Sequence, residues 1–281
     1  MEPLLTVNHL SVRLKKKGTL LVNDVSFQAN SGQILGIIGE SGSGKSMTCR
    51  ALMGLLDPSR FLISGDAIFK GQDLFKLPSK KLRLLRGNHI AMIMQNPMTA
   101  FDPVTRIGSQ MVETLRAHQQ ISKEQAVTSI TQELAKLGLG DVPRILNSYP
   151  HELSGGMLQR IMIALALLLS PELIIADEAT TALDVHTQAV ILEEFTAIRN
   201  AGISMIVVTH NFGVLAKLAD DVVVLHDGSV VEHGSVYQIF DKPTQPYTQE
   251  LLQASNLKRG CFCDRSSTLD KNLLVTQIAK K

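Results

Sequence analysis

Residues 39–46 read Gly-Glu-Ser-Gly-Ser-Gly-Lys-Ser, and this stretch decides the fold. It fits G-x-x-x-x-G-K-[ST], the pattern of a phosphate-binding loop. The apolar residues 34–38 before it predict a β-strand, and residues 47–52 after it can continue as a helix. Glycines allow consecutive N–H groups to turn toward an anion, and the following helix presents its positive end to the same anion. The candidate phosphate-binding residues are Gly39, Glu40, Ser41, Gly42, Ser43, Gly44, Lys45 and Ser46.

Two side chains of this loop have predicted roles in nucleotide binding. Lys45 would reach the β- and γ-phosphates, and the Ser46 hydroxyl would hold Mg²⁺. The alternative is a glycine-rich turn that happens to carry a lysine. The strand and helix expected on either side favour the phosphate-binding interpretation.

Composition excludes several other classes of protein. The chain has 281 residues, 44% of them hydrophobic, so it can bury a sizeable core. Its net charge of +2 gives no reason to propose a nucleic-acid partner. The longest apolar run, residues 161–169, is far shorter than the about 20 residues of a membrane-spanning helix. Because the N-terminus lacks a signal-peptide pattern, we expect a location in the cytoplasm.

Hydrophobic periodicity predicts an α/β fold. Near-alternate apolar residues over 4–14, followed by 25–27, indicate a small N-terminal antiparallel sheet, and strand-like pieces with turns at Ser64-Gly65-Asp66 and 70–73 follow. Residues 108–146 show helical spacing, with Ser122 as an N-cap. The later segments alternate between strands and helices, which favours a mainly parallel sheet covered by helices. Their expected ranges are 90–94, 172–176, 187–200, 204–208, 214–218 and a strand pair turning at 227–228.

Two adjacent carboxylates end the apolar strand that precedes them. Successive strand residues face opposite sides, so Asp177 and Glu178 can do different work. Asp177 can support Mg²⁺, and Glu178 can act as the general base that polarises the attacking water. An acidic strand-to-loop turn without chemistry is the alternative.

Residues 153–160 read Leu-Ser-Gly-Gly-Met-Leu-Gln-Arg. They indicate which class of nucleotide-binding protein this chain resembles. Ser154, Gly155 and Gly156 begin an expected helix and so form a second anion site at a helix N-terminus. Here the sequence resembles the ATP-binding cassette family, whose signature motif is LSGGxxQR. The resemblance implies ATP and Mg²⁺ as cofactors. It also implies that the signature of one cassette closes on the ATP held by the loop of another.

Three further positions match family motifs one by one. Gln95 matches the Q-loop glutamine, which senses Mg²⁺ and the attacking water and lies next to the transmembrane partner. Asp184 matches the D-loop, which communicates across the dimer, and His210 matches the switch histidine that contacts the γ-phosphate. The resemblance thus implies Glu178, His210 and Gln95 as catalytic residues, and Ser46, Gln95 and Asp177 around the metal.

The chain departs from the family pattern twice. No aromatic residue lies between Arg13 and Val25, where many cassettes carry the side chain that stacks on adenine. We expect aliphatic side chains to support the base instead. Ala179 stands where proline is usual and leaves the turn less constrained. Hydrolysis is expected to survive, because both carboxylates are intact.

Residues 92–97, 100–103, 149–160 and 243–252 resemble the ATPases of bacterial nickel and peptide importers. The resemblance is strongest to the first ATP-binding subunit of nickel or metallophore importers, and it leaves dipeptide or oligopeptide import as the alternative. It implies a second cassette, two transmembrane permease subunits and an extracytoplasmic substrate-binding protein as partners. The chain would then lie at the cytoplasmic face of the membrane. An exporter cassette, or a cassette ATPase acting on DNA or ribosomes, is less favoured.

The same resemblance gives an expected domain organisation. Residues 1–254 would form one cassette, with a helical subdomain inserted at about 97–165. Residues 255–281, which include Cys261 and Cys263, are expected to form a C-terminal tail.

Overall fold

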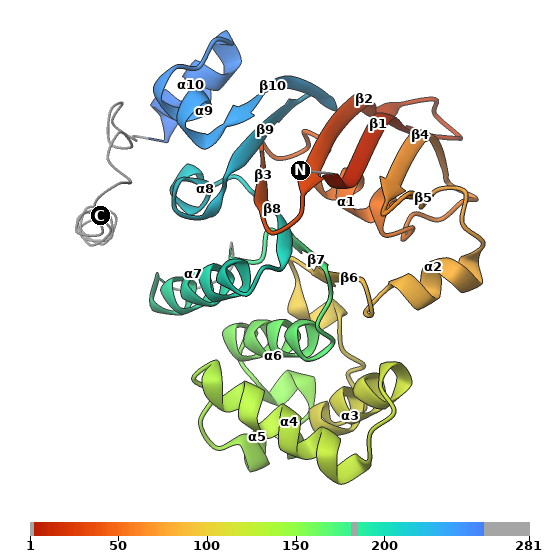
Figure 1. Ribbon diagram of the computed structural model, residues 1–281, viewed down its shortest axis with the longest axis vertical. Helices are drawn as coiled ribbons and strands as arrows, with labels where there is room; N and C mark the ends of the chain where they lie inside the picture. The colour runs from red at the N-terminus through yellow and green to blue at the C-terminus, as the bar shows by residue number, and fades with distance from the viewer. Residues whose placement is uncertain (1–2, 181–184, 256–281) are drawn as a thin grey trace.

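The computed structural model describes residues 3–180 and 185–255. Two β-sheets and a set of helices make up this part of the chain (Figure 1). The smaller sheet is antiparallel, and the larger one is mostly parallel. The α/β fold expected from the sequence is therefore confirmed.

The antiparallel sheet has the strand order β2-β1-β4-β5. Its members are β1 (Pro3–Leu14), β2 (Leu20–Asn30), β4 (Phe61–Phe69) and β5 (Gln72–Asp73). The predicted turn at Ser64-Gly65-Asp66 is wrong, because these residues lie inside β4. Gly65 has a φ of 97° and faces a register shift in β1 between Asn8 and Ser11, so it marks a β-bulge. A Cβ there would lie 2.5 Å from the carbonyl oxygen of His9.

The larger sheet has the strand order β10-β9-β3-β8-β7-β6. Strands β9, β3, β8, β7 and β6 run parallel, and only β10 pairs in the antiparallel sense. A turn at 227–228 joins β9 to β10, as the sequence predicts. The strands are β3 (Ile34–Ile38), β6 (Ile90–Ile93), β7 (Leu173–Asp177), β8 (Ser204–Thr209), β9 (Asp221–His226) and β10 (Ser229–Ser235).

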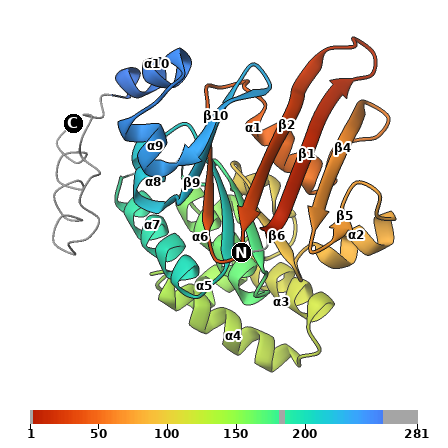
Figure 2. The ribbon, with the colours of Figure 1, turned by 45° about the horizontal axis from the view of Figure 1, so that its top comes forward.

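The helices divide into those near the sheets and a group toward one end of the molecule. Helices α3, α4, α5 and α6 lie together at that end, while the antiparallel sheet lies elsewhere, beside the parallel sheet (Figures 1 and 2). Ser122 caps α4 through a full capping box, as expected from the sequence. The helices are α1 (Lys45–Leu52), α2 (Ser79–Leu85), η1 (Pro97–Thr99), α3 (Ile107–His118), α4 (Lys123–Lys136), α5 (Val142–Asn147), η2 (Pro150–Glu152), α6 (Gly155–Leu168), α7 (Val185–Asn200), α8 (Phe212–Leu218), α9 (Val236–Asp241) and α10 (Pro246–Ala254).

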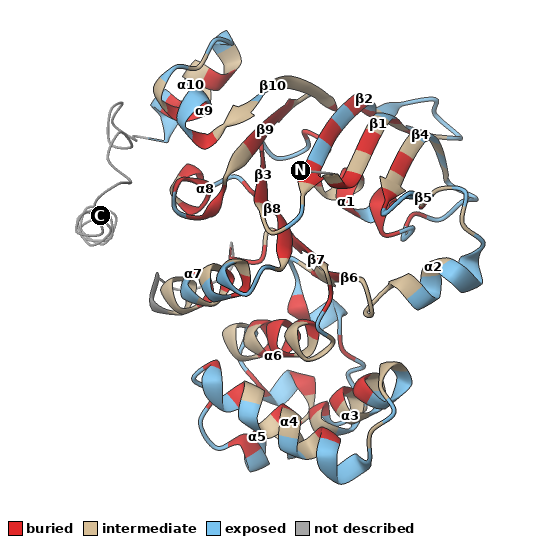
Figure 3. Cartoon of the chain, in the orientation of Figure 1, coloured by how far each residue is buried: buried red, intermediate tan, exposed pale blue. Residues whose placement is uncertain are grey.

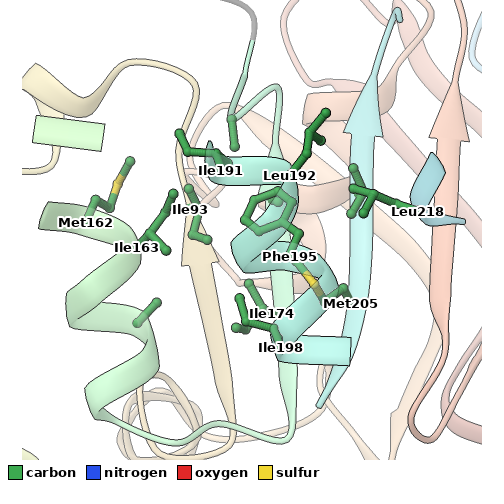
Figure 4. Close-up of a cluster of buried hydrophobic side chains, with 14 of the residues drawn as sticks. Ile93, Met162, Ile163, Ile174, Ile191, Leu192, Phe195, Ile198, Met205 and Leu218 are labelled. Carbon is green, nitrogen blue, oxygen red and sulfur yellow. The ribbon is translucent and has the colours of Figure 1, made fainter. Parts of the chain in front are cut away.

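Strand β3 shows how the core is divided. Ile34 and Ile38 belong to one apolar cluster, whereas Leu35 and Ile37 belong to another. Neighbouring strand residues face opposite sides, so both faces of this sheet are covered. The central strands are accordingly buried along their length (Figure 3). In the first cluster Phe195 of α7 is fully buried, close to Ile174 of β7 and Ile198 (Figure 4).

Parallel strands bring their carboxyl ends to one edge of the sheet. The loops after β3, β6, β7 and β8 therefore meet at that edge, where open α/β sheets bind ligands. Across residues 3–180 and 185–255, no helix combines the length and apolar character needed to cross a bilayer.

Candidate functional site

The predicted site residues that follow the parallel strands lie together. Residues 39–44 connect β3 to α1, and Gln95 follows β6. Asp177 ends β7, with Glu178 directly after it, and His210 follows β8. Positions far apart in the sequence thus converge on one edge of the sheet.

The phosphate-binding loop adopts a conformation that glycine permits. Gly42 and Gly44 have φ values of 88° and 97°, in the region that other residues rarely adopt. Gly44 is also the N-cap of α1. A Cβ on Gly39 would lie 2.1 Å from the carbonyl oxygen of Leu225 in β9, so no side chain fits there. The loop is consequently packed tightly against the end of β9.

Lys45 is held inside the loop. Its Nζ donates to the carbonyl oxygens of Gly39, at 2.8 Å, and Glu40, at 2.7 Å. Only 4% of the residue is exposed. Burial lowers the pKa of Lys45, although the nearby carboxylates of Glu178 and Asp177 act in the opposite direction. The ammonium group is therefore partly desolvated and close to where a phosphate would lie.

Ser46 and Asp177 form a hydrogen-bonded pair. The Ser46 hydroxyl donates to Asp177 Oδ1 at 2.8 Å, and Asp177 is only 2% exposed. Burial raises the pKa of the Asp177 carboxyl, and the hydrogen bond from Ser46 opposes that shift. A buried carboxylate beside a hydroxyl suits a hard divalent cation such as Mg²⁺, which prefers oxygen ligands.

Glu178 lies between two of the other predicted residues. Gln95 Nε2 donates to Glu178 Oε2 at 2.7 Å, and His210 Nδ1 lies 3.8 Å from Glu178 Oε1. Glu178 has a φ of 47°, and its backbone N–H bonds to the carbonyl of Val208 in β8. The bond ties the backbone of Glu178 to β8, and the positive φ is a strained conformation of the kind found at functional sites.

A cavity of about 320 Å³ opens beside these groups. Lys45, Ser46, Gln95 and Glu178 line it, together with the aliphatic side chain of Leu21 from β2. Aliphatic support for a base is expected from the sequence, but nothing in β2 itself marks Leu21 for that position. The full lining is Leu21, Ser41, Gly42, Gly44, Lys45, Ser46, Met47, Gln95 and Glu178.

The signature residues lie elsewhere. Ser154 is exposed and is the N-cap of α6, where its Oγ accepts from the N–H of Met157 at 3.3 Å. Within the described chain, residues 154–156 do not line the cavity beside the phosphate-binding loop. Asp184 lies outside the described residues. Ala179, the residue that replaces the usual proline, is buried in the larger apolar cluster.

Comparison with known proteins identifies the family. A sequence profile described as ABC transporter matches residues 22–181. The chain belongs to the ABC transporter family. The cassette is 46% identical to the metal-staphylopine import system ATP-binding protein CntD of Staphylococcus aureus, over 89% of this chain and 92% of that protein. It is 44% identical to the oligopeptide transport ATP-binding protein OppD of Haemophilus influenzae, over 90% of this chain and 79% of that protein.

A solved structure supports the same assignment. The cassette superimposes with a TM-score of 0.74 on MJ0796, a dimeric ATP-binding cassette in a post-hydrolysis state bound to ADP and phosphate. The two are 25% identical, over 83% of this chain and 98% of that one. The fold, the phosphate-binding loop and the family together make this chain an ATP-hydrolysing transporter cassette.

Proposed function

We propose that this cassette is the ATP-hydrolysing subunit of a bacterial importer for nickel or for a metal–metallophore complex. The observation that carries the proposal is the 46% identity to a metal-staphylopine import protein, which extends over nearly the whole of both chains. Dipeptide or oligopeptide import is the second candidate, because OppD is almost as similar at 44% identity.

The site residues have separate roles in this proposal. Glu178 takes the proton from the water that attacks the γ-phosphate, and Gln95 holds the Glu178 carboxylate through the 2.7 Å hydrogen bond. His210, 3.8 Å from the same carboxylate, is placed to contact the γ-phosphate. Lys45 leaves the loop carbonyls to bind phosphate oxygens, which are a stronger partner for an ammonium group.

The donor set fits Mg²⁺. Ser46 and Asp177 supply the oxygen ligands, and the side-chain oxygen of Gln95 is a third candidate. When bound, the ion would neutralise charge that builds up on the β- and γ-phosphates. The raised pKa of Asp177 is consistent with a carboxylate whose charge lacks full compensation in the protein alone.

The second half of the ATP site is proposed to come from another cassette. Ser154 and Gly155 are exposed at the N-terminus of α6, where an anion is favoured, yet they do not contribute to the cavity around Lys45. A partner cassette could use them to cover its own nucleotide. The related cassette MJ0796, bound to ADP and phosphate, is dimeric.

A surface next to Gln95 is suited to the permease subunits. A second cavity of about 440 Å³ is lined there by Met92, Met94 and Leu55, and Met98 is exposed nearby. An exposed group of apolar side chains surrounded by polar residues is typical of a protein interface. Through this contact the cassette would be held at the cytoplasmic face of the membrane, and a substrate-binding protein outside would deliver the cargo.

Uptake by whole cells tests the proposal. In a strain that lacks the gene, we expect uptake of radioactive nickel, supplied with its metallophore, to fall to background and labelled dipeptide uptake to stay normal. The wild-type gene should restore nickel uptake, and Lys45→Ala should not. Loss of dipeptide uptake alone would instead favour the second candidate.

A further inference from the structure

Helix α10, the last helix of the described residues, contacts the phosphate-binding loop through the side chain of Tyr247. The Tyr247 hydroxyl accepts a hydrogen bond from the backbone N–H of Glu40 at 3.3 Å. In both orientations, α10 lies beside α9 at the end of β10 (Figures 1 and 2). This contact joins residues that are 207 positions apart, and none of the roles derived above requires it.

The hydrogen bond acts on the same peptide unit that holds Lys45. The N–H of Glu40 and the C=O of Gly39 belong to one peptide plane. The carbonyl end accepts from Lys45 Nζ at 2.8 Å, while the N–H end donates to Tyr247. A positive charge at the carbonyl polarises the peptide and makes its N–H a stronger donor. Tyr247 and Lys45 therefore bind the two polar groups of the Gly39–Glu40 peptide, at the start of the phosphate-binding loop.

Two neighbours set the position of Tyr247. Its ring lies against the ring of His226 at the end of β9, with centroids 3.9 Å apart. Glu232 of β10 anchors the start of α10, because Glu232 Oε1 accepts from both the N–H and the hydroxyl of Thr244. Partial burial acts to raise the pKa of the Glu232 carboxyl, but hydrogen bonds from Thr244 and Gln245 oppose it, and that pKa lies below its usual value.

The Tyr247 hydroxyl is neutral at physiological pH, because an unperturbed phenol has a pKa of about 10. Burial raises the pKa of Tyr247 further. Gly39 also lies close to the carbonyl of Leu225 in β9, because a Cβ at this position would lie 2.1 Å from that oxygen. The peptide plane is thus held between β9, Lys45 and Tyr247.

We infer that Tyr247 is a positioning residue for nucleotide binding. It acts through the Gly39–Glu40 peptide, and Glu232 holds it in position by anchoring the start of α10. It keeps the loop in its binding conformation before the nucleotide arrives, which lowers the cost of ordering on binding. The inference rests on the assignment of residues 39–46 as the phosphate-binding loop.

Titration of the purified full-length chain with trinitrophenyl-ATP tests this inference. Tyr247→Phe keeps the ring on His226 and removes only the acceptor oxygen. Its dissociation constant should rise by roughly two- to tenfold, the usual range for one hydrogen bond. The melting temperature of the nucleotide-free protein should fall by no more than about 4 °C. Gln253→Ala, at an exposed position of the same helix, is the matched control and should bind as the wild type does.

Three further variants distinguish failure of this inference from failure of the loop assignment. Glu232→Ala should weaken binding, and adding Tyr247→Phe to it should cost less than the sum of the two single effects, because both act on one contact. Unchanged affinity in Tyr247→Phe, or strict additivity, would overturn the inference. Lys45→Ala should bind far more weakly than any of these variants. If Lys45→Ala binds normally, the loop assignment itself is wrong.

Discussion

Glu178→Gln should stop turnover while leaving ATP binding intact. The amide has nearly the same shape as the carboxylate, and its oxygen can still accept the hydrogen bond that Gln95 donates at 2.7 Å. Glutamine can also adopt the φ of 47° at no greater cost than glutamate. What the variant loses is a group that can take the proton from water.

The magnitude follows from that loss. A positioned general base contributes about 10²- to 10⁴-fold, so kcat should fall at least about 100-fold, or roughly 2.7 kcal/mol in the barrier. The dissociation constant for ATP should stay within about twofold, because Lys45 and Ser46, the side chains proposed to hold phosphate and Mg²⁺, are not altered.

Phosphate release by the assembled transporter measures kcat, and trinitrophenyl-ATP titration measures binding. Glu250→Gln makes the same chemical change at an exposed position of α10 and should leave both unchanged. Hydrolysis by Glu178→Gln at more than about a third of the wild-type rate would refute the role of Glu178 as the base.

Three other substitutions test the site and the core. Asp177→Asn should raise the melting temperature of the nucleotide-free protein, because burial raises the pKa of Asp177 and the charged form is disfavoured. The folded pKa of Asp177 lies above the unfolded value of 3.8, so the wild type loses stability as Asp177 ionises with rising pH. The difference in melting temperature between Asp177→Asn and the wild type should therefore be larger at pH 7 than at about pH 4, as measured by thermal melts at each pH. Gly39→Ala should abolish trinitrophenyl-ATP binding, because its Cβ would meet the carbonyl of Leu225 at 2.1 Å. Phe195→Ala, in the fully buried core, should cost about 3–5 kcal/mol in denaturant titrations.

Local sequence signals predicted the elements whose structure depends on nearby residues. The apolar run at 34–38 and the loop after it form β3 and the turn into α1. Ser122 caps its helix because the capping box is complete within four residues. Gln95, Glu178 and His210 lie together because each follows a strand of one parallel sheet.

Features set by distant contacts could not be predicted in the same way. Gly65 lies in a bulge of β4 because β1 shifts its register opposite it, and a glycine between polar residues looks like a turn when taken alone. The short helices α2 and α9 have too few turns to show a period. Tyr247 reaches Glu40 only because β9 and β10 carry α10 to the loop.

We propose that the phosphate-binding loop and the signature residues 154–156 of this chain serve two different ATP sites. Binding of trinitrophenyl-ATP by the isolated full-length chain tests it directly, with Ser154→Arg compared against Lys45→Ala. Ser154→Arg should bind as tightly as the wild type, yet block hydrolysis at the partner's site once the complex is assembled. Lys45→Ala should lose binding in the isolated chain. Loss of binding in isolated Ser154→Arg would contradict the claim, because Ser154 would then support the nucleotide held by its own chain.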